Sequence, residues 1–353
     1  MKAWVLHGIG DLRYEDVDMP LLKPNESLVE VRACGICGSD IPRIYQTGTY
    51  HFPTIPGHEF SGVVKRIGSD VDSHLLGRRI GVFPLIPCME CEQCKRQQYE
   101  MCSHYSYLGS RTDGGFAEYV AVPQWNLIEL PKNVSFEQAA MLEPMAVTVH
   151  AMRSALKGYR ELTKQTCIAV CGLGTIGVLL TMFLLEAGYR NLLVIGNKEF
   201  QRKTMLELGI PADNILDSRG WDIASWLMEH TEGHGVDIFF DCVGRNEVIA
   251  AGINAAATGG MIQLVGNPAS DMLLDKASFW NILRRQLTLQ GSWNSSYTQS
   301  EEDDWHYVFE RLSEGRIYPE KFVTHRLGFS ELEKGLHIMR DKTEAYGKVM
   351  AVK

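Results

Sequence analysis

Residues 166–177 read TCIAVCGLGTIG, and this stretch decides the fold. The apolar run at 166–171 is typical of a buried strand, and three glycines follow it with the spacing Gly172-x-Gly174-x-x-Gly177. An apolar helix is expected directly after them, at residues 176–186. Glycines in a turn are common, but a strand, a glycine turn and a helix in this order predict a dinucleotide-binding βα unit.

Each position in this turn has an expected task. Gly172 should form the tight turn, Gly174 should leave room for a pyrophosphate, and Gly177 should let the helix pack closely on the strand. Thr175 and Ile176 begin the helix, whose N-terminal N–H groups and dipole would face the phosphates.

Further along the chain, strand-like and helix-like segments alternate, which predicts a parallel, doubly wound sheet covered on both faces. The expected strands are 166–171, 191–195, 236–241, 261–265 and 287–291, and the expected helices are 176–186, 199–208, 223–231 and 247–256. The N-terminal third differs, because short apolar segments at 27–33, 62–67, 79–83 and 116–122 are separated by turn residues, as in a β-rich domain. The tail predicts helices at 301–312 and 330–339 and a strand at 348–352.

The length of 353 residues exceeds what one ordinary core supports, so two domains are expected. We place one domain at 148–292 and the other at 1–147 together with 293–353. Hydrophobic residues make up 45% of the chain and charged residues 22%, as in a globular protein. The net charge of −8 argues against nucleic-acid partners and gives anionic membranes no attraction.

No apolar run approaches about 18 residues, so no membrane span is expected. The N-terminus enters a strand pattern at once and shows no signal-peptide core. The nine cysteines are an odd number, and they suit a reducing compartment better than a disulfide framework. The sequence therefore predicts a cytoplasmic protein.

Four cysteines form a short motif after residue 87, at Cys88, Cys91, Cys94 and Cys102. Two C-x-x-C steps that share Cys91, amid Glu, Gln, Lys and Arg, make a cluster of buried thiols a poor explanation. Four thiolates close a tetrahedral shell, which is the structural kind of zinc site. A zinc ribbon that contacts nucleic acid would use similar spacing, but the acidity of the chain speaks against it.

A second group, Cys37, His58 and Glu59, offers sulfur, nitrogen and oxygen donors. Gly57 would let the backbone turn so that adjacent residues face one ion, and Asp40 could orient a ligand. Three protein ligands leave a position for water or substrate, which is the catalytic kind of zinc site. We therefore expect two zinc ions per chain.

The end of the second expected strand bears on the choice of cofactor. NAD-binding chains carry Asp or Glu there to hold the ribose 2′-hydroxyl, whereas this chain continues Gly196-Asn197-Lys198, with Arg202 a turn later. Without a carboxylate to repel a 2′-phosphate, NADP is favoured over NAD, and Lys198 could pair with the phosphate. Glu199 would restore NAD if its side chain reached the ribose.

Several motifs together resemble the medium-chain zinc-dependent dehydrogenases. They occur in the order of that family, namely 34–40 (CGICGSD), 57–59 (GHE), the four cysteines, 114–119 (GGFAEY), 142–144 (LEP) and the glycine fingerprint. The resemblance covers essentially the whole chain and is closest to the sugar-alcohol enzymes, including those that act on phosphates, through the segments 37–44, 108–114 and 282–293. It implies a β-rich, GroES-like catalytic domain with a zinc lobe, beside a Rossmann domain.

The implied activity is NAD(P)-dependent oxidation of a secondary alcohol of a polyol or polyol phosphate. Enzymes of the sorbitol, threonine and simple-alcohol types are alternatives within the family, and a non-catalytic zinc-ribbon protein is an alternative of another class. The resemblance further implies a homodimer or homotetramer.

The resemblance also suggests roles for single residues. Glu143 lies where polyol enzymes use a glutamate on the metal or on its water, so Glu59 and Glu143 could share the remaining ligand positions. Ser39 would relay the alcohol proton, although a turn serine is the simpler alternative. Thr148 would lie beside the nicotinamide, and Phe116 would wall the substrate pocket unless it is a core residue.

Recognition of a substrate phosphate is expected at Arg43, six residues after Cys37, because the resembled polyol-phosphate enzymes have an equivalent arginine. A guanidinium can bind phosphate through two parallel hydrogen bonds. Arg43 could instead form a surface pair or support the fold. Arg111 and Lys348 are further candidates, and Lys348 could instead meet the pyrophosphate of the cofactor.

Overall fold

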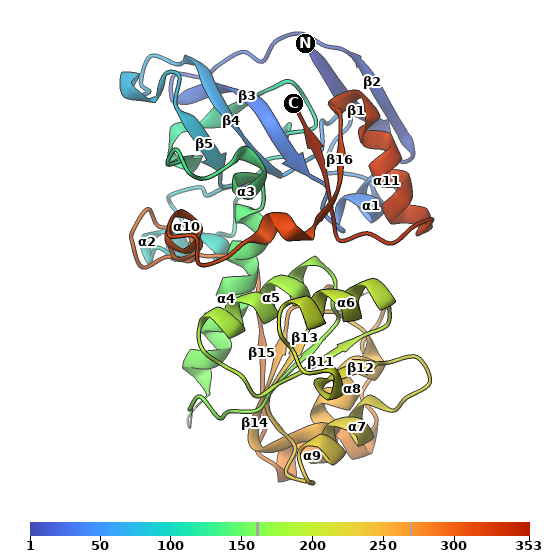
Figure 1. The fold of residues 1–353 in the computed structure, drawn as a ribbon. Coiled ribbons are helices and arrows are strands. Elements are labelled where there is room, and N and C mark those ends of the chain that lie inside the picture. Colours follow the sequence, from blue (N-terminus) through green and yellow to red (C-terminus); the bar gives the residue numbers. More distant parts are fainter. Residues whose placement is uncertain (160–161, 269) are drawn as a thin grey trace. The chain divides into compact units, whose positions relative to one another are not determined.

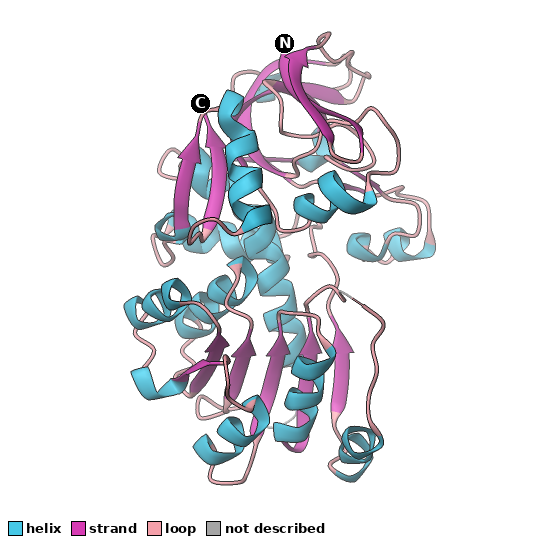
Figure 2. Ribbon diagram, turned by 90° about the vertical axis from the view of Figure 1, so that its right-hand side faces the viewer, coloured by secondary structure: helices cyan, strands magenta, loops and turns pink. Residues whose placement is uncertain are grey.

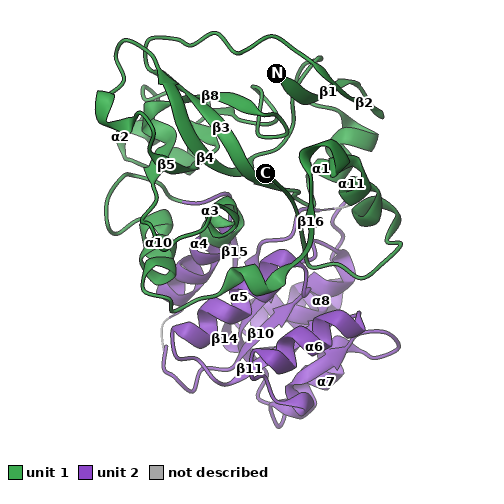
Figure 3. Cartoon of the chain, turned by 45° about the horizontal axis from the view of Figure 1, so that its top comes forward, with its two compact units in different colours: residues 1–146, 296–353 green, residues 147–295 purple. Residues whose placement is uncertain are grey.

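The computed structural model describes residues 1–159, 162–268 and 270–353. The chain forms two compact units (Figure 3). Unit 1 comprises Met1–Ala146 and Ser296–Lys353, and unit 2 comprises Val147–Ser295. The sequence placed these boundaries at 147/148 and 292/293. Helix α4 (Leu142–Gly158) contains the first boundary.

Unit 2 is built on a parallel sheet of six strands (Figure 1). They are β10 (Ile168–Cys171), β11 (Leu192–Gly196), β12 (Ile215–Asp217), β13 (Val236–Asp241), β14 (Ala256–Leu264) and β15 (Thr288–Gly291). Their order is β12-β11-β10-β13-β14-β15, which is the doubly wound order of dinucleotide-binding folds. All four residues of β10 are buried, as expected for a central strand that is covered on both faces.

Helices lie on both sides of this sheet (Figure 2), and they follow the strands in alternation: α5 (Thr175–Glu186), α6 (Glu199–Glu207), α7 (Ile223–His230), α8 (Asn246–Ala255) and α9 (Lys276–Arg284). The expected elements are confirmed within a few residues at their ends, but β12 and α9 were not expected. Strand β12 has only three residues, too few to show a period. Asp275 is the N-cap of α9, and its side chain accepts hydrogen bonds from the N–H groups of Ala277 and Ser278.

Unit 1 contains a mixed sheet of seven strands: β3 (Glu26–Gly35), β4 (Glu59–Ile67), β5 (Arg79–Val82), β8 (Tyr119–Pro123), β9 (Leu127–Glu129), β16 (Val323–Leu327) and β17 (Lys348–Val352). Strand β3 is central, since β4, β8 and β17 all pair with it antiparallel. Two small ribbons, β1 (Lys2–Gly8) with β2 (Asp11–Asp16) and β6 (Leu85–Ile86) with β7 (Ser106–Tyr107), complete the strands.

The α-helices of unit 1 other than α4 are α1 (Asp40–Pro42), α2 (Glu92–Lys95), α3 (Phe136–Ala140), α10 (Asp304–Ser313) and α11 (Leu332–Asp341). The fold class expected from the sequence, a Rossmann sheet plus a β-rich domain that carries the cysteine lobe, is confirmed. Within the described residues, no helix has both the length and the apolarity that crossing a bilayer requires.

Candidate metal centres and cofactor loop

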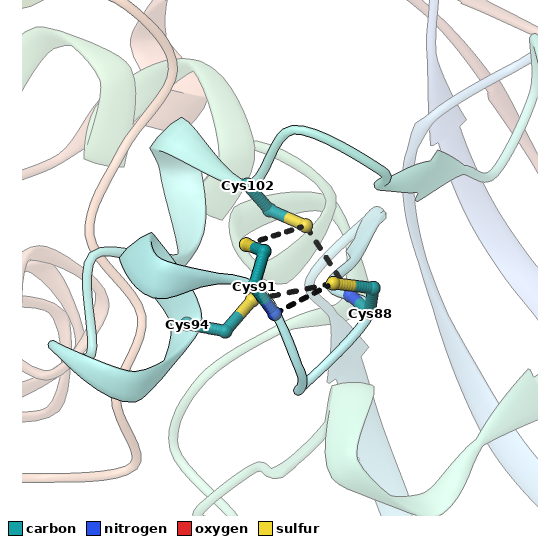
Figure 4. A group of neighbouring side chains, drawn as sticks. All are labelled: Cys88, Cys91, Cys94 and Cys102. Carbon is teal, nitrogen blue, oxygen red and sulfur yellow. Dashed lines mark hydrogen bonds between the residues drawn. The ribbon is translucent and has the colours of Figure 1, made fainter.

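The four cysteines of the lobe converge with their sulfur atoms on one point (Figure 4). Cys88 Sγ lies 3.9 Å from Cys94 Sγ, and Cys91 Sγ lies 3.9 Å from Cys102 Sγ. Thiolates bound to a tetrahedral zinc at about 2.3 Å are about 3.8 Å apart, whereas a disulfide needs a separation of about 2.05 Å. The lobe therefore fits a closed zinc shell and not a pair of disulfides.

Backbone N–H groups donate hydrogen bonds to the sulfur atoms of this lobe and so favour the thiolate form that binds a cation. The N–H of Cys91 donates to Cys88 Sγ at 3.4 Å, and the N–H of Cys88 donates to Cys102 Sγ at 3.3 Å. Backbone donors lower the pKa of the Cys91 thiol to about 5, while burial raises the pKa of Cys94 to about 12. Four thiolates this close repel one another, so only a bound cation would keep all four deprotonated.

The second group forms where β3 and β4 lie side by side. Gly35 at the end of β3 is paired in register with Glu59, the first residue of β4, so Cys37 follows directly beside His58 and Glu59. The ligand atoms of these three residues all lie within 4.8 Å of one another. His58 and Glu59 are buried, and the mixed donor set fits zinc with a position left for another ligand.

Gly57 makes the turn into this group possible. Its φ is +94°, and a Cβ built there would lie 2.5 Å from Cδ1 of Phe116. The N–H of Phe116 donates to the carbonyl of Pro56 at 2.9 Å, and strand β8 begins at Tyr119 and not at 116 as expected. Phe116 was expected at the substrate pocket. It is wholly buried in the core of unit 1, where its ring supports the Gly57 turn.

Asp40 is the buried anchor of the group. Its carboxylate accepts from the N–H of Cys37 at 2.9 Å and from Nη1 of Arg43 at 3.0 Å, and it lies 3.4 Å from Nδ1 of His58. Burial alone would raise the pKa of Asp40, but the charges of His58 and Arg43 outweigh burial and lower it. An ionised Asp40 can therefore hold the imidazole in one orientation. Arg43, which was expected to bind substrate phosphate, is ion-paired with this carboxylate.

Ser39 precedes α1 at its N-cap position, yet its side chain makes no cap hydrogen bond. The hydroxyl instead donates to Cys37 Sγ at 3.2 Å. The alternative of a turn serine bonded to local backbone therefore lacks support at the N-cap, and the hydroxyl lies against a candidate metal ligand.

Glu143 is buried in the first turn of α4, in the N-terminal part of that helix, which belongs to unit 1. The phenol of Tyr107 donates to its Oε1 at 3.1 Å, and the Tyr107 ring meets the His58 ring edge-on at 5.7 Å. Burial raises the pKa of Glu143, and the charge of His58 offsets only part of this rise. Glu143 thus lies near the three candidate ligands without joining their group. Nothing in the sequence pointed to Tyr107.

Lys348, at the start of β17, is buried beside Glu59. Its ammonium contacts Oε2 of Glu59 and donates to the carbonyl of Ile36 at 3.0 Å. Burial would lower the pKa of Lys348, but the Glu59 charge outweighs burial and raises it. The sequence suggested that Lys348 meets a phosphate of the cofactor or substrate. In the structure, its charge is balanced by Glu59.

In unit 2, the glycine fingerprint follows β10 and opens α5. Gly172 has a φ of +98°, and a Cβ there would lie 2.5 Å from Cγ2 of Val243. A Cβ at Gly174 would meet no atom within 4 Å, so the space in front of the helix N-terminus is open, whereas a Cβ at Gly177 would overlap the carbonyl oxygen of Gly172. These are the conditions that a bound pyrophosphate would require.

Four other expected cofactor residues also have clear positions. Thr175 and Ile176 form the first turn of α5 and are partly exposed, while Thr148 is fully buried in α4. The N–H of Asn197 donates to Oε1 of Gln201 at 3.1 Å, which ties the end of β11 to helix α6.

The end of β11 borders a cavity lined by residues 173, 196, 198, 199, 202 and 215–217. Lys198 and Arg202 supply positive charge there, as expected. The expectation that no carboxylate stands there was wrong, because Asp217 at the end of β12 pairs in register with Gly196 and lines the same cavity. Hydrogen bonds from Arg219 lower the pKa of Asp217 to about 2. Asp217 could not be found by inspecting β11, since it comes from the next strand.

Two family profiles match the chain. The profile described as "Alcohol dehydrogenase GroES-like domain" matches residues 23–132, and the one described as "Zinc-binding dehydrogenase" matches residues 175–314.

Characterised relatives and a solved structure align over nearly the whole length. Galactitol 1-phosphate 5-dehydrogenase of Escherichia coli (strain K12) is 28% identical over 353 residues, which is 100% of both chains. L-idonate 5-dehydrogenase of Vitis vinifera is 32% identical over 340 residues, covering 94% of this chain and 88% of the relative. The crystal structure of galactitol-1-phosphate dehydrogenase from Escherichia coli superposes with a TM-score of 0.90 at 29% identity, covering 100% of both chains.

Proposed function

The chain belongs to the zinc-dependent medium-chain alcohol and polyol dehydrogenases, and from this premise we propose that it oxidises a secondary alcohol of a polyol or polyol phosphate, reversibly, with NAD(P). Membership in an enzyme family removes the alternative of a non-catalytic zinc-ribbon protein. The observation that carries the proposal is the convergence of Cys37, His58 and Glu59 in one buried group, since an alcohol oxygen needs a metal with a free position.

We assign two zinc ions to each chain. The four-cysteine lobe would hold the structural ion. Cys37, His58 and Glu59 would ligate the catalytic ion, and Glu143 is the second carboxylate able to reach it or the water on it. Two carboxylates near one zinc reduce its positive charge, which tunes the acidity of a bound alcohol.

The residues around the metal group have separable tasks in this reaction. When bound, zinc supplies Lewis acidity at the alcohol oxygen and the nicotinamide accepts the hydride. The Asp40 charge faces Nδ1 of His58 at 3.4 Å and would favour the tautomer that leaves the other ring nitrogen to ligate. The partly exposed Ser39 hydroxyl, beside Cys37 Sγ, takes the alcohol proton toward solvent. Tyr107 keeps the Glu143 carboxylate in place through its phenol.

The substrate class rests on the relatives, which are named for a galactitol phosphate and for L-idonate. We propose a polyol or polyol phosphate on that ground. Sorbitol-type, threonine-type and simple-alcohol-type activities are the alternatives. The test incubates the zinc-loaded protein with galactitol, galactitol 1-phosphate, sorbitol, L-idonate, threonine and 2-propanol, and follows the absorbance of the reduced nicotinamide. Silence with every substrate and both cofactors would contradict the proposal.

For the cofactor, we propose NADP over NAD, with Lys198 and Arg202 facing the 2′-phosphate. Asp217 opposes this choice, but Arg219 balances its charge. Replacing both Lys198 and Arg202 by Ala should lower kcat/KM for NADP about 10–100-fold and leave the value for NAD nearly unchanged. A native preference for NAD would contradict the assignment.

The oligomeric state of the protein and its location in the cell are also proposals. We propose a homodimer or homotetramer in the cytoplasm, from the resemblance and the cysteine usage. Light scattering on the purified protein would measure the number of chains directly.

A further inference from the structure

Three cations on unit 1 were candidates for binding an anionic substrate group, and the structure separates them. Arg43 is paired with Asp40, and Lys348 is paired with Glu59, so the charges of both are balanced within the protein. Arg111 is different: among the residues that the structure describes, no carboxylate forms an ion pair with its guanidinium.

Two aromatic rings lie against the Arg111 guanidinium. Its Cζ lies 4.0 Å from the centroid of the Tyr50 ring and 4.5 Å from the centroid of the Tyr105 ring. Its Nε is buried and makes no hydrogen bond. A cation–π contact with a ring uses none of the N–H groups of a guanidinium, so these groups can still donate to an acceptor. Arg111 is thus a preoriented donor whose charge the protein does not balance.

The backbone brings Arg111 close to the metal group. The N–H of Arg111 donates to the carbonyl of Tyr107 at 2.9 Å, so one tight turn joins the two residues. Tyr107 in turn contacts both His58 and Glu143. The rings of Tyr105 and Tyr107 meet edge-on at 6.3 Å. A single short segment therefore carries a residue that contacts the metal group and the unpaired guanidinium.

We propose that Arg111 binds a terminal oxyanion of the substrate, a phosphate monoester or a carboxylate, while the metal group binds a hydroxyl further along the same carbon chain. This inference rests on the proposed function and deepens it by naming the substrate class. Two parallel N–H···O hydrogen bonds from the edge of the guanidinium suit either oxyanion. The competing explanation is that Arg111 only fastens the loop at residue 50 to the loop at residue 105.

Calorimetric titration of the zinc-loaded protein distinguishes the two explanations. The ligands are galactitol 1-phosphate, L-idonate and uncharged galactitol, and the proteins are wild type, Arg111→Gln, Arg111→Lys and the control Arg78→Gln, which removes an exposed charge elsewhere on unit 1. Wild type should bind one of the two anions at least about tenfold more tightly than galactitol, and the preferred anion identifies the oxyanion. Arg111→Gln should abolish that preference, Arg111→Lys should retain part of it, and Arg78→Gln should leave it intact.

A fastening role predicts a different pattern, in which Arg111→Gln weakens all three ligands equally and lowers the midpoint of thermal unfolding. That pattern, or a wild type without preference for either anion, would overturn the inference. If the anion binds zinc or the glycine loop instead, the preference for the anion would remain in Arg111→Gln. That result would also contradict the inference. Turnover of galactitol that persists in Arg111→Gln would leave the proposed function standing, so the two claims fail separately.

Discussion

The two cysteine-containing groups of unit 1 are built in opposite ways. The lobe takes four identical donors from residues 88–102, and its internal contacts are backbone N–H groups of the same segment. The mixed group takes three different donors from two strand ends, and its supporting residues Tyr107, Glu143 and Lys348 come from distant parts of the chain.

This difference indicates which group depends on its metal for structure. The four sulfur atoms of the lobe come from one short segment and repel one another when they are ionised, so its zinc would contribute directly to folding. The mixed group already has a buried network in which Asp40, Lys348 and Tyr107 fix the ligands. Its zinc would contribute chemistry, because the protein supplies the geometry. The predictions below test that division, from the largest expected effect to the smallest.

Cys37→Ser removes a ligand from the mixed group. Turnover should fall by about 10³-fold or more, since several kcal/mol of charge stabilisation at the alcohol oxygen is lost. The protein should keep about one zinc per chain by elemental analysis and unfold near the wild-type temperature. The matched control is Cys34→Ala, which changes a buried thiol near the end of β3, three residues before Cys37 and outside either metal group, and should retain turnover. An equal loss of turnover in Cys37→Ser and Cys34→Ala would contradict a specific role of the Cys37 thiolate in the reaction.

Cys94→Ser removes a ligand from the lobe, and it should lower stability while leaving turnover nearly unchanged. We expect the free energy of unfolding to fall by about 3 kcal/mol or more, because a structural zinc site is lost. At a temperature where the variant remains folded, kcat should stay within about threefold of wild type. Chemical denaturation and steady-state kinetics on the same preparation measure both quantities. A stable variant that has lost turnover would show that the roles of the two groups were exchanged.

Asp40→Asn tests whether the buried network of the mixed group positions His58. The amide keeps the shape but removes the charge that faces the imidazole, so zinc affinity or kcat should drop about 10–100-fold. Zinc binding followed by competition with a chromophoric chelator measures the affinity apart from turnover. If zinc affinity and kcat are both unchanged, the Asp40 charge is not needed to position His58.

Glu30→Gln perturbs β3, the strand that leads to the mixed group, without touching either metal group. Burial would raise the pKa of Glu30, but hydrogen bonds from Lys353 and Lys65 outweigh burial and lower it from 4.5 to about 2. The ionised carboxylate therefore stabilises the fold above about pH 4.5, and this stabilisation is lost as the pH falls toward 2.

A pKa difference of this size corresponds to about 3 kcal/mol. The two lysines are 40% and 43% exposed, so screening reduces the expected cost of Glu30→Gln to about 1–2 kcal/mol at pH 7. Urea unfolding at pH 7 and at pH 3 should show the difference between variant and wild type shrinking with acidity. A difference that is constant with pH would point to packing and not to charge.

The same contrast explains what could be predicted from the sequence. The lobe and the glycine fingerprint are local, so spacing alone located Cys88–Cys102 and Gly172–Gly177. The alternating strands and helices of unit 2 were equally readable, since each buried strand such as β10 is one apolar run. Strand β12, with three residues, was too short to leave such a signal.

The contacts of the residues that support the mixed group could not be predicted from local spacing in the sequence. The ion pair of Lys348 with Glu59 and the hydrogen bond of Tyr107 to Glu143 join residues 289 and 36 positions apart along the chain. The resemblance suggested Arg43 as a phosphate ligand, but only the structure places Asp40 against its guanidinium. Asp217 was missed for the same reason, because register between β11 and β12 brings it to Gly196.

Stepwise removal of zinc tests the central claim most directly. The wild-type protein is dialysed against a chelator of graded strength, and zinc per chain, turnover and secondary structure are measured on each sample. We predict that turnover disappears as the first of two zinc ions leaves, that the fold persists at one zinc per chain, and that added zinc restores activity. Turnover that survives the loss of the first ion, or that falls only together with the fold as the second ion leaves, would contradict the assignment of chemistry to the mixed group.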